Sequence, residues 1–355
     1  MNKNVQAALT EKELIRDLND FILEQVASDE FSGAVLVAKN GLPVYKHAFG
    51  LADQASNIPN RLDTRFNIAS ITKVFTAIAI VQLAERGLLH FDDLVSQHLP
   101  DYPRQVAERV SIHHLLTHTS GLGNYWNDAY RARRTELRAV KDYLELIKPQ
   151  PLAFTPGERF QYSNCGYVLL GAIIERVSGL CYDDYLQEFI FRPAHMNDTA
   201  RYDLDRIVHK LAVGYTFQDW DGTFHPGYRT DNRYLYAVKG SPATGMYSTI
   251  HDLLKFDLAL REYKLLTPEY TQMAITGKVD SNQPNTRYAY GFYTMNGNWG
   301  RAIGHGGHTL GGDANYHMYL DAGYTVVVLS NYDRPAARTI AHTLADMFTA
   351  MYSQA

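Results

Sequence analysis

Cysteine is scarce in this chain: 355 residues contain only Cys165 and Cys181. Two cysteines are too few for a disulfide scaffold. They also lie near opposite ends of an expected helix, and sixteen helical residues separate them by roughly 24 Å. A disulfide bond cannot span that distance. We therefore expect two buried free thiols.

An excess of one charge is also missing, because 34 Lys and Arg balance 38 Asp and Glu for a net charge of −4. Without a basic excess, nucleic acid is not expected as a main partner. No apolar run is long enough to span a bilayer, and residues 1–6 carry no apolar signal segment. We expect a cytoplasmic protein, or a periplasmic or secreted one if a signal peptide has been trimmed.

What the sequence does contain is a serine and a lysine ahead of a strongly apolar run. Residues 66–73 read FNIASITK, and nearly every position from Ile71 to Glu85 is apolar. A helix that is apolar on nearly every side is a buried one. Ser70 and Lys73, three residues apart at its first turn, would share one face. Free backbone N–H groups at the same end can receive an oxyanion.

This pair suggests nucleophilic catalysis. Serine needs a base beside it to become a nucleophile. Lysine has an ordinary pKa of about 10.4, but burial disfavours the ammonium, so Lys73 could accept the proton of Ser70. The alternative is that Ser70 only caps the helix while Lys73 extends to water. The S-x-x-K pattern alone does not decide between them.

The rest of the pattern predicts an α+β fold. An amphipathic helix over residues 9–26 precedes two strands around Asn40-Gly41, a strong hairpin signal. Short helices and loops follow, with a second apolar helix over residues 166–177 and a basic helix carrying Arg131 to Lys141. Four strands are expected late in the chain, before a final helix over 334–352. These strands span residues 288–295, 302–305, 314–320 and 324–331.

The simplest assembly pairs the early hairpin with the late strands in one antiparallel sheet covered by helices. This predicts a discontinuous sheet lobe of residues 9–90 and 250–355, and a mainly helical lobe of residues 91–249. Ser70 and Lys73 would then lie at the seam between the lobes, a common place for a ligand site.

Two further motifs help to decide whether Ser70 and Lys73 are catalytic. They are Tyr162-Ser163-Asn164 and His305-Gly306-Gly307. With residues 115–122 (LLTHTSGL) and 156–158 (PGE), they resemble the serine β-lactamase and penicillin-binding-protein superfamily, in its class C-like branch of esterases and D-aminopeptidases. The resemblance implies a β-lactamase/transpeptidase-like fold and a serine hydrolase that needs no cofactor and no metal.

The resemblance also implies roles for individual residues. Ser70 would be the acyl-accepting nucleophile and Lys73 its partner. Tyr162 would be a base or proton shuttle, its phenolate favoured by two cations. Asn164 would donate to the substrate amide or contact Lys73.

The third motif would serve the substrate. The backbone N–H groups of Ser70 and His308 would form the oxyanion hole, with Gly307 beside them. His305 stands where penicillin-binding proteins usually have lysine. Because histidine is mostly neutral near pH 7, this difference argues against efficient β-lactam hydrolysis.

Each of these residues also has a structural interpretation. Tyr162 could be a core tyrosine, and His305 could belong to a tight turn. His113, His114 and His118 have helical spacing, but no glutamate lies between the i, i+4 pair and no acidic third ligand is apparent. We therefore expect no metal site.

The sequence thus predicts an acyl-enzyme hydrolase of ester or amide bonds, whose partner is a small-molecule ester, amide or D-amino-acid peptide. The alternative is a non-catalytic penicillin-recognising or scaffold protein of the same fold. The run from Arg131 could hold a substrate carboxylate or form a solvated face. Six aromatic residues could line an acyl pocket or only pack the lobe. These are Tyr125, Trp126, Tyr130, Tyr228, Tyr234 and Tyr236.

Overall fold

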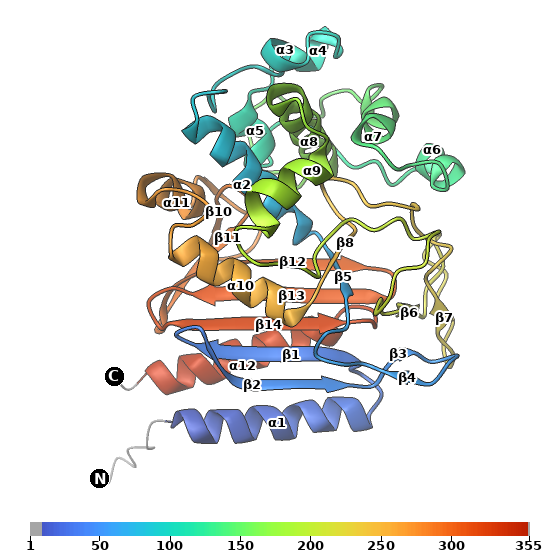
Figure 1. Ribbon diagram of the computed structural model, residues 1–355, viewed down its shortest axis with the longest axis vertical. Coiled ribbons are helices and arrows are strands. Elements are labelled where there is room, and N and C mark those ends of the chain that lie inside the picture. Colours follow the sequence, from blue (N-terminus) through green and yellow to red (C-terminus); the bar gives the residue numbers. More distant parts are fainter. Residues whose placement is uncertain (1–8, 354–355) are drawn as a thin grey trace.

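The fold is an eight-stranded antiparallel sheet with helices on both faces (Figure 1), seen in a computed structural model that describes residues 9–353. The strand order is β2-β1-β14-β13-β12-β11-β10-β9, and three two-stranded ribbons lie outside this sheet. The predicted antiparallel sheet flanked by helices is confirmed.

The helices and strands have the following bounds. The helices are α1 Glu11–Ala27, α2 Thr72–Glu85, α3 Val95–His98, α4 Arg104–Ala107, α5 Ile112–Leu116, α6 Asp128–Arg133, α7 Val140–Ile147, α8 Asn164–Ser178, α9 Tyr182–Leu186, the π-helix η1 Gln187–Phe191, α10 Ile250–Arg261, α11 Pro268–Ile275 and α12 Ala336–Tyr352. The strands are β1 Gly33–Lys39, β2 Leu42–Phe49, β3 Leu51–Asp53, β4 Ile58–Pro59, β5 Phe66–Ala69, β6 Tyr215–Thr216, β7 Thr230–Asp231, β8 Met246–Ser248, β9 Val279–Asp280, β10 Thr286–Tyr288, β11 Tyr293–Gly297, β12 Gly300–Thr309, β13 Gly312–Tyr319 and β14 Tyr324–Ser330.

The early hairpin joins the late strands as expected. Asn40 and Gly41 have φ values of 49° and 79°, as the two-residue turns that match strand twist require. Strand β1 then pairs antiparallel with β14, with Gly33 opposite Ser330. The first and last strands of the chain are therefore neighbours in the sheet, one strand in from the edge that β2 forms.

Strand β14 is buried along its whole length because helices cover both of its faces. Val326 and Val328 pack into the core formed with α1 and α12. Val327 and Leu329 alternate with them and pack into the larger core around α2. Because successive side chains of a strand point to opposite faces, β14 contributes to the cores on both sides of the sheet.

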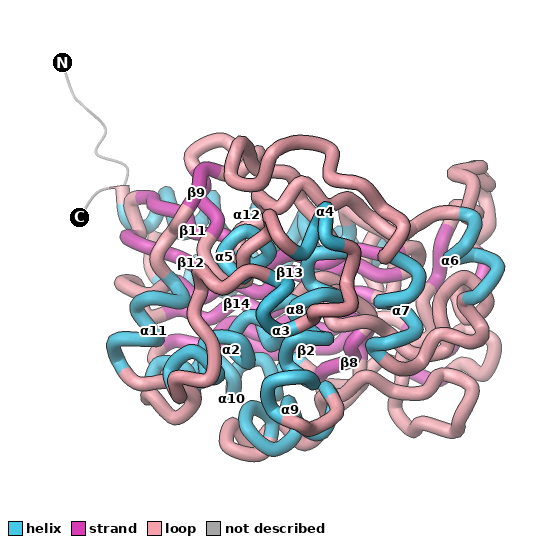
Figure 2. The backbone as a smooth tube through the Cα atoms, turned by 90° about the horizontal axis from the view of Figure 1, so that it is seen from above, coloured by secondary structure: helices cyan, strands magenta, loops and turns pink. Residues whose placement is uncertain are grey.

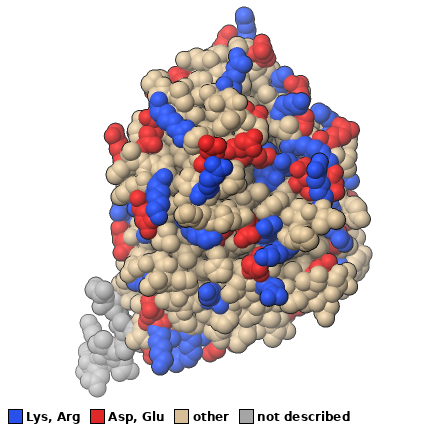
Figure 3. Space-filling view, viewed as in Figure 1, with Lys and Arg blue, Asp and Glu red and all other residues tan. Residues whose placement is uncertain are grey.

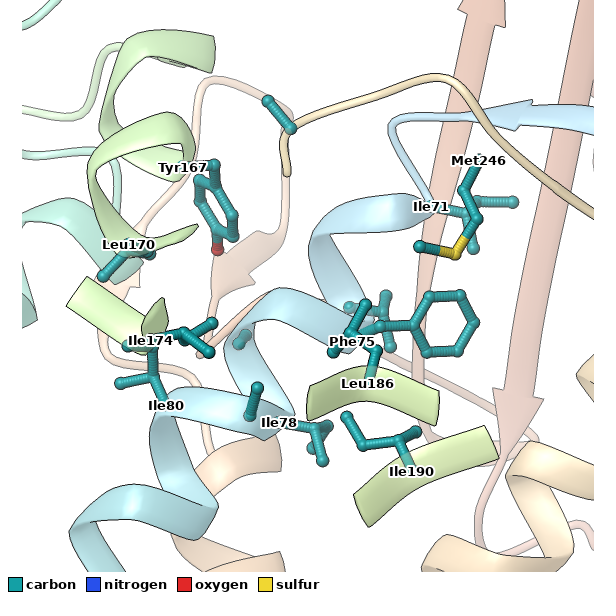
Figure 4. Packing of buried hydrophobic residues seen from close by; sticks show 14 of the residues in the cluster. Ile71, Phe75, Ile78, Ile80, Tyr167, Leu170, Ile174, Leu186, Ile190 and Met246 are labelled. Atoms are coloured by element: carbon teal, nitrogen blue, oxygen red, sulfur yellow. The ribbon is translucent and has the colours of Figure 1, made fainter. Parts of the chain in front are cut away.

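Helix α2 lies between the sheet and the helices above it. Every one of its residues except Glu85 is buried, as the all-apolar sequence predicts. Figure 4 shows Phe75 of α2 near Leu186 of α9, and Ile80 of α2 near Ile174 of α8. Seen from above, α8 and the short helices around it cover the sheet beside α2 (Figure 2).

Some local expectations are wrong. The basic segment forms two short helices, α6 and α7, rather than one, and its Arg138 makes ion pairs with Asp203 and Asp205. Cys165 is a buried free thiol, but Cys181 is exposed. The reason is that α8 ends at Gly179, in the left-handed conformation with φ 73°, so Cys181 lies beyond this helix and is the exposed N-cap residue of α9.

The surface carries both signs of charge. On the face shown in Figure 3, Lys and Arg are interspersed with Asp and Glu. Within residues 9–353, no single helix is long and apolar enough to cross a membrane. Only α8 taken together with the segment Tyr182–Phe191 passes that test, and the two parts meet at a bend of 80°.

Candidate active site

Ser70 is presented by a sharp turn between β5 and α2. Ala69, the last residue of β5, has φ 44°, a left-handed conformation that a residue with a Cβ adopts only at some cost. The turn continues with hydrogen bonds from Lys73 N to Ser70 O at 3.0 Å and from Val74 N to Ile71 O at 3.0 Å. Ser70 is thereby placed at the mouth of α2, half-buried rather than enclosed.

Lys73 points back toward this serine. Its Nζ lies 3.2 Å from Ser70 Oγ, 2.6 Å from Asn164 Oδ1 and 2.7 Å from the carbonyl oxygen of Ala243. Asn164 comes from the first turn of α8 and Ala243 from the loop before β8. Three remote segments therefore converge on one amine.

The surroundings of Lys73 favour an uncharged amine. The side chain is fully buried, and burial holds the pKa of Lys73 well below its ordinary value. A neutral amine has two N–H donors, which match the two carbonyl oxygens of Asn164 and Ala243. Its lone pair is then left for the hydroxyl proton of Ser70, which is the geometry of a general base.

Tyr162 lies on the other side of Lys73. The lysine Nζ is 4.7 Å from the centre of the Tyr162 ring. The phenol oxygen is buried, with no partner at hydrogen-bond geometry among the described residues. Burial raises the pKa of Tyr162 well above its ordinary value, and the nearby Ser70 hydroxyl opposes that rise. The phenolate expected from two neighbouring cations is not favoured, because burial disfavours any charge here.

His118 fixes the ring of Tyr162. The two rings pack against each other at an angle of 36°, with centroids 4.3 Å apart, and His118 Nδ1 accepts a hydrogen bond from Ser163 N at 3.1 Å. His118 is fully buried, and burial holds its pKa well below the ordinary value. Sequence analysis assigned no active-site role to His118, although its place in the LLTHTSGL stretch was the available signal.

The other two histidines of that stretch lie elsewhere. His113 Nδ1 is 3.0 Å from Tyr290 Oη, and His114 Nδ1 accepts from Ser111 N at 3.2 Å. Within residues 9–353, no group of three His, Cys, Asp or Glu side chains is arranged so that it could hold a metal ion.

His305 is buried on β12, with its ring centroid 6.1 Å from that of Tyr162. Its Nε2 lies 3.2 Å from Tyr288 Oη, and its Nδ1 lies 2.5 Å from the carbonyl oxygen of Gly306. Burial, and secondarily Lys73, lowers the pKa of His305 to about 3. The residue that replaces the usual lysine of penicillin-binding proteins is therefore neutral, and it borders the site without touching Ser70.

Gly307 brings β12 against the serine turn. A Cβ added at Gly307 would lie 2.4 Å from the carbonyl oxygen of Ile68 and 2.8 Å from the backbone nitrogen of Ser70. The next residue, His308, is exposed. Beyond Gly304 strand β12 has no partner in β11, whereas it still pairs with β13 as far as Thr309. The serine turn thus lies along an open strand edge.

This contact gives a matched pair of glycine variants. In Gly307→Ala the new methyl group must push β12 away from the Ser70 amide, and we expect kcat for an ester to fall by roughly 10²-fold or more, as when an oxyanion donor is lost. At Gly306 a Cβ would meet nothing nearer than 3.6 Å, so Gly306→Ala should stay within a few-fold of wild type. Equal effects of the two substitutions on kcat would contradict this geometry.

Comparison with known proteins places the chain among penicillin-binding proteins and esterases. The family model described as Beta-lactamase matches residues 18–350. The chain is 32% identical over 331 residues to "Penicillin-binding protein 4*" of Bacillus subtilis, covering 89% of this chain and 72% of that protein. It is 36% identical to esterase EstB of Burkholderia gladioli over 182 residues, covering 47% and 46% of the two chains. The solved penicillin-binding protein from Bacillus halodurans superposes with a TM-score of 0.82 at 34% identity, covering 92% of this chain and 99% of the other.

Proposed function

This chain belongs to the Beta-lactamase family. We propose that it hydrolyses ester or amide bonds through an acyl-enzyme formed on Ser70. Relatives in the comparisons include an esterase and a solved penicillin-binding protein of the same fold, which supports this proposal. The observation that carries the proposal is the position of the Lys73 amine. It is buried, held by two carbonyl oxygens, and lies 3.2 Å from the serine hydroxyl.

In the proposed acylation step, Ser70 Oγ attacks the carbonyl carbon of the substrate while its proton passes to Lys73. The backbone N–H groups of Ser70 and His308 stabilise the oxyanion at the open edge of β12. The bond to the leaving alcohol or amine then breaks. The Tyr162 hydroxyl, which has no hydrogen-bond partner among the described residues, supplies the leaving group with a proton and regains one from Lys73.

In the proposed deacylation step, a water molecule takes the place of the leaving group. Lys73 accepts a proton from the water as the water oxygen attacks the carbonyl carbon, and it returns that proton to Ser70 Oγ when the bond between Ser70 and the acid breaks. Asn164 acts by holding the Lys73 amine in place. We place the candidate substrates among small esters and among amides such as D-aminoacyl peptides. The neutral His305 supports esters over β-lactams, because no fixed cation adjoins the serine there to bind a carboxylate.

Covalent labelling tests this proposal directly. The purified protein is treated with a serine-reactive fluorophosphonate and, separately, with a p-nitrophenyl ester, a D-amino-acid amide and a penicillin, and is then weighed intact by mass spectrometry. We expect one adduct per chain with the fluorophosphonate, mapped by peptide sequencing to Ser70, and transient adducts with the ester. An adduct on another serine, or none with any reagent, would contradict the proposal and favour a non-catalytic scaffold.

A further inference from the structure

The end of β12 that carries the proposed oxyanion donor is supported by a strand on one side only. After Gly304, β12 pairs with β13 alone. A two-residue turn joins these strands, with Thr309 opposite Gly312. The closing pair of such a turn exchanges hydrogen bonds, and N–H groups alternate in direction along a strand. The N–H of the preceding residue, His308, therefore points to the open edge.

The carbonyl oxygen of Leu310, two residues after His308, is held by two side chains. Asn232 Nδ2 donates to it at 2.9 Å, and Tyr236 Oη donates to it at 2.7 Å. Because a carbonyl oxygen has two lone pairs, these two donors fill its hydrogen-bonding capacity. Tyr236 is one of the aromatic residues considered for an acyl pocket, and its hydroxyl group holds the turn instead.

Asn232 is itself fixed by the backbone of another segment. Its side chain is buried, and Asn232 Oδ1 accepts a hydrogen bond from Gly214 N at 3.1 Å. The backbone N of Asn232 donates in turn to Gly214 O at 2.9 Å. With both ends of its amide bonded, Asn232 links the turn after β12 to the segment that precedes β6.

Gly311, the second residue of the turn, is held by Asp333. Gly311 N donates to Asp333 Oδ1 at 2.6 Å, and Phe217 N donates to Asp333 Oδ2 at 2.8 Å. The turn also lies tightly against Gly214, where an added Cβ would come within 2.1 Å of Gly311 O. Three remote parts of the chain therefore fix this turn, namely residues 214–217, 232–236 and 333.

From these contacts we infer that Asn232 and Tyr236 are positioning residues for the proposed reaction. By holding the Leu310 carbonyl, they keep the His308 N–H aligned with the oxyanion. Within residues 9–353, neither side chain hydrogen-bonds to Ser70, so both act through the strand. A displacement of about 1 Å can lower a rate by roughly 10²-fold. The inference rests on the proposed function and adds two residues on which its oxyanion hole depends.

The test separates loss of alignment from loss of fold. Turnover of phenyl acetate is compared with that of its thiono counterpart, in which sulfur replaces the carbonyl oxygen. Sulfur is larger and is a weaker hydrogen-bond acceptor, so an aligned pair of N–H groups stabilises the oxygen compound far more. For the wild type we expect kcat/KM for the ester to exceed that for the thionoester by roughly 10²-fold or more.

Two variants remove the two bonds to the turn. In Asn232→Ala we expect kcat for the ester to fall by roughly 10- to 100-fold with KM changed less than about twofold, and kcat/KM for the thionoester to change less than about threefold. Tyr236→Phe keeps the ring and loses only the hydroxyl group. It should show a smaller loss of the same kind, because Asn232 still holds the carbonyl.

Asn60→Ala is the matched control for these variants. Asn60 is also buried, and its Nδ2 donates to Phe49 O at 2.8 Å, at the end of β2. Its loss should lower the melting temperature without changing turnover of either substrate. The same fall in kcat in this variant as in Asn232→Ala would show that any buried amide has this effect, and would overturn the inference.

Other results would also overturn it. Equal losses on the ester and the thionoester, or a higher KM with unchanged kcat, would mean that Asn232 and Tyr236 only stabilise the fold. Unchanged kcat in both variants would contradict any positioning role. If Asn232→Ala does not fold, Tyr236→Phe decides by the same measurements. A wild type that hydrolyses no ester and takes up no fluorophosphonate would instead contradict the proposed function.

Discussion

Replacing Ser70 by alanine is expected to lower kcat/KM for any ester substrate by roughly 10⁴-fold or more, because removing the nucleophile leaves only oxyanion stabilisation and binding to accelerate the reaction. The same variant should take up no fluorophosphonate. Ser70 is half-buried, and its hydroxyl oxygen contacts only the Lys73 amine among the described hydrogen bonds. The fold should therefore survive, which thermal unfolding followed by circular dichroism will check.

Ser248→Ala is the matched control for this loss. Ser248 is buried on β8, opposite Phe66 of β5, and its hydroxyl pairs with that of Thr199 at 2.8 Å. Its removal deletes a buried hydroxyl on the strand that pairs with β5, and this hydroxyl bonds to Thr199 rather than to Ser70 or Lys73. We expect a modest fall in melting temperature and activity within a few-fold of wild type. If Ser70→Ala retained more than a tenth of the wild-type kcat/KM, Ser70 would not be the nucleophile.

Replacing Lys73 by methionine is expected to cause the second large loss of activity. The substitution keeps the length of the side chain but removes the base, so kcat should fall by about 10³-fold, within the range of general base catalysis. Fluorophosphonate labelling should slow by a similar factor without disappearing, because Ser70 remains. Lys278→Met is the control, because Lys278 is also partly buried with a lowered pKa but lies over the ring of Tyr290.

Lys73 also sets a pH dependence of stability. Its pKa is far below 10.5 in the folded chain and ordinary in the unfolded chain, so between these two values the unfolded chain binds more protons. The free energy of unfolding should then rise with pH across that window and level off above about 10.5. Relative to Lys73→Met, the wild type should gain up to about 1.4 kcal/mol per pH unit within that window. Urea unfolding at several pH values measures this difference, and parallel curves would mean that Lys73 stays charged.

Sequence patterns predicted those parts of the fold that depend on local chemistry. The Asn40-Gly41 turn, the all-apolar run of α2 and the β-branched run of β14 each act through backbone geometry or burial that the residues themselves determine. The division of the basic segment into α6 and α7 escaped prediction, because Arg138 is held by Asp203 and Asp205. Those partners are more than sixty residues away along the chain.

The candidate site shows the same division. Ser70, Lys73, Tyr162 and Asn164 could be named from motifs, and the structure brings them together. The protonation of Tyr162 and the packing of His118 against it could not be predicted, because they follow from burial by residues distant in the sequence, such as Tyr288 beside His118. The contact between Lys73 and the Ala243 carbonyl was also missed, because every residue type has a backbone carbonyl and the sequence does not indicate which one is used.

Helix α2 has a consequence for how the protein loses activity on heating. The helix that follows the proposed nucleophile and carries the proposed base is buried at every residue except Glu85, within the larger core. No peripheral segment can melt and carry Ser70 and Lys73 away while the rest stays folded, since local openings start where few apolar contacts hold a segment. Loss of activity and global unfolding should therefore show the same dependence on temperature. The remaining turnover would then measure the fraction of molecules that are still folded.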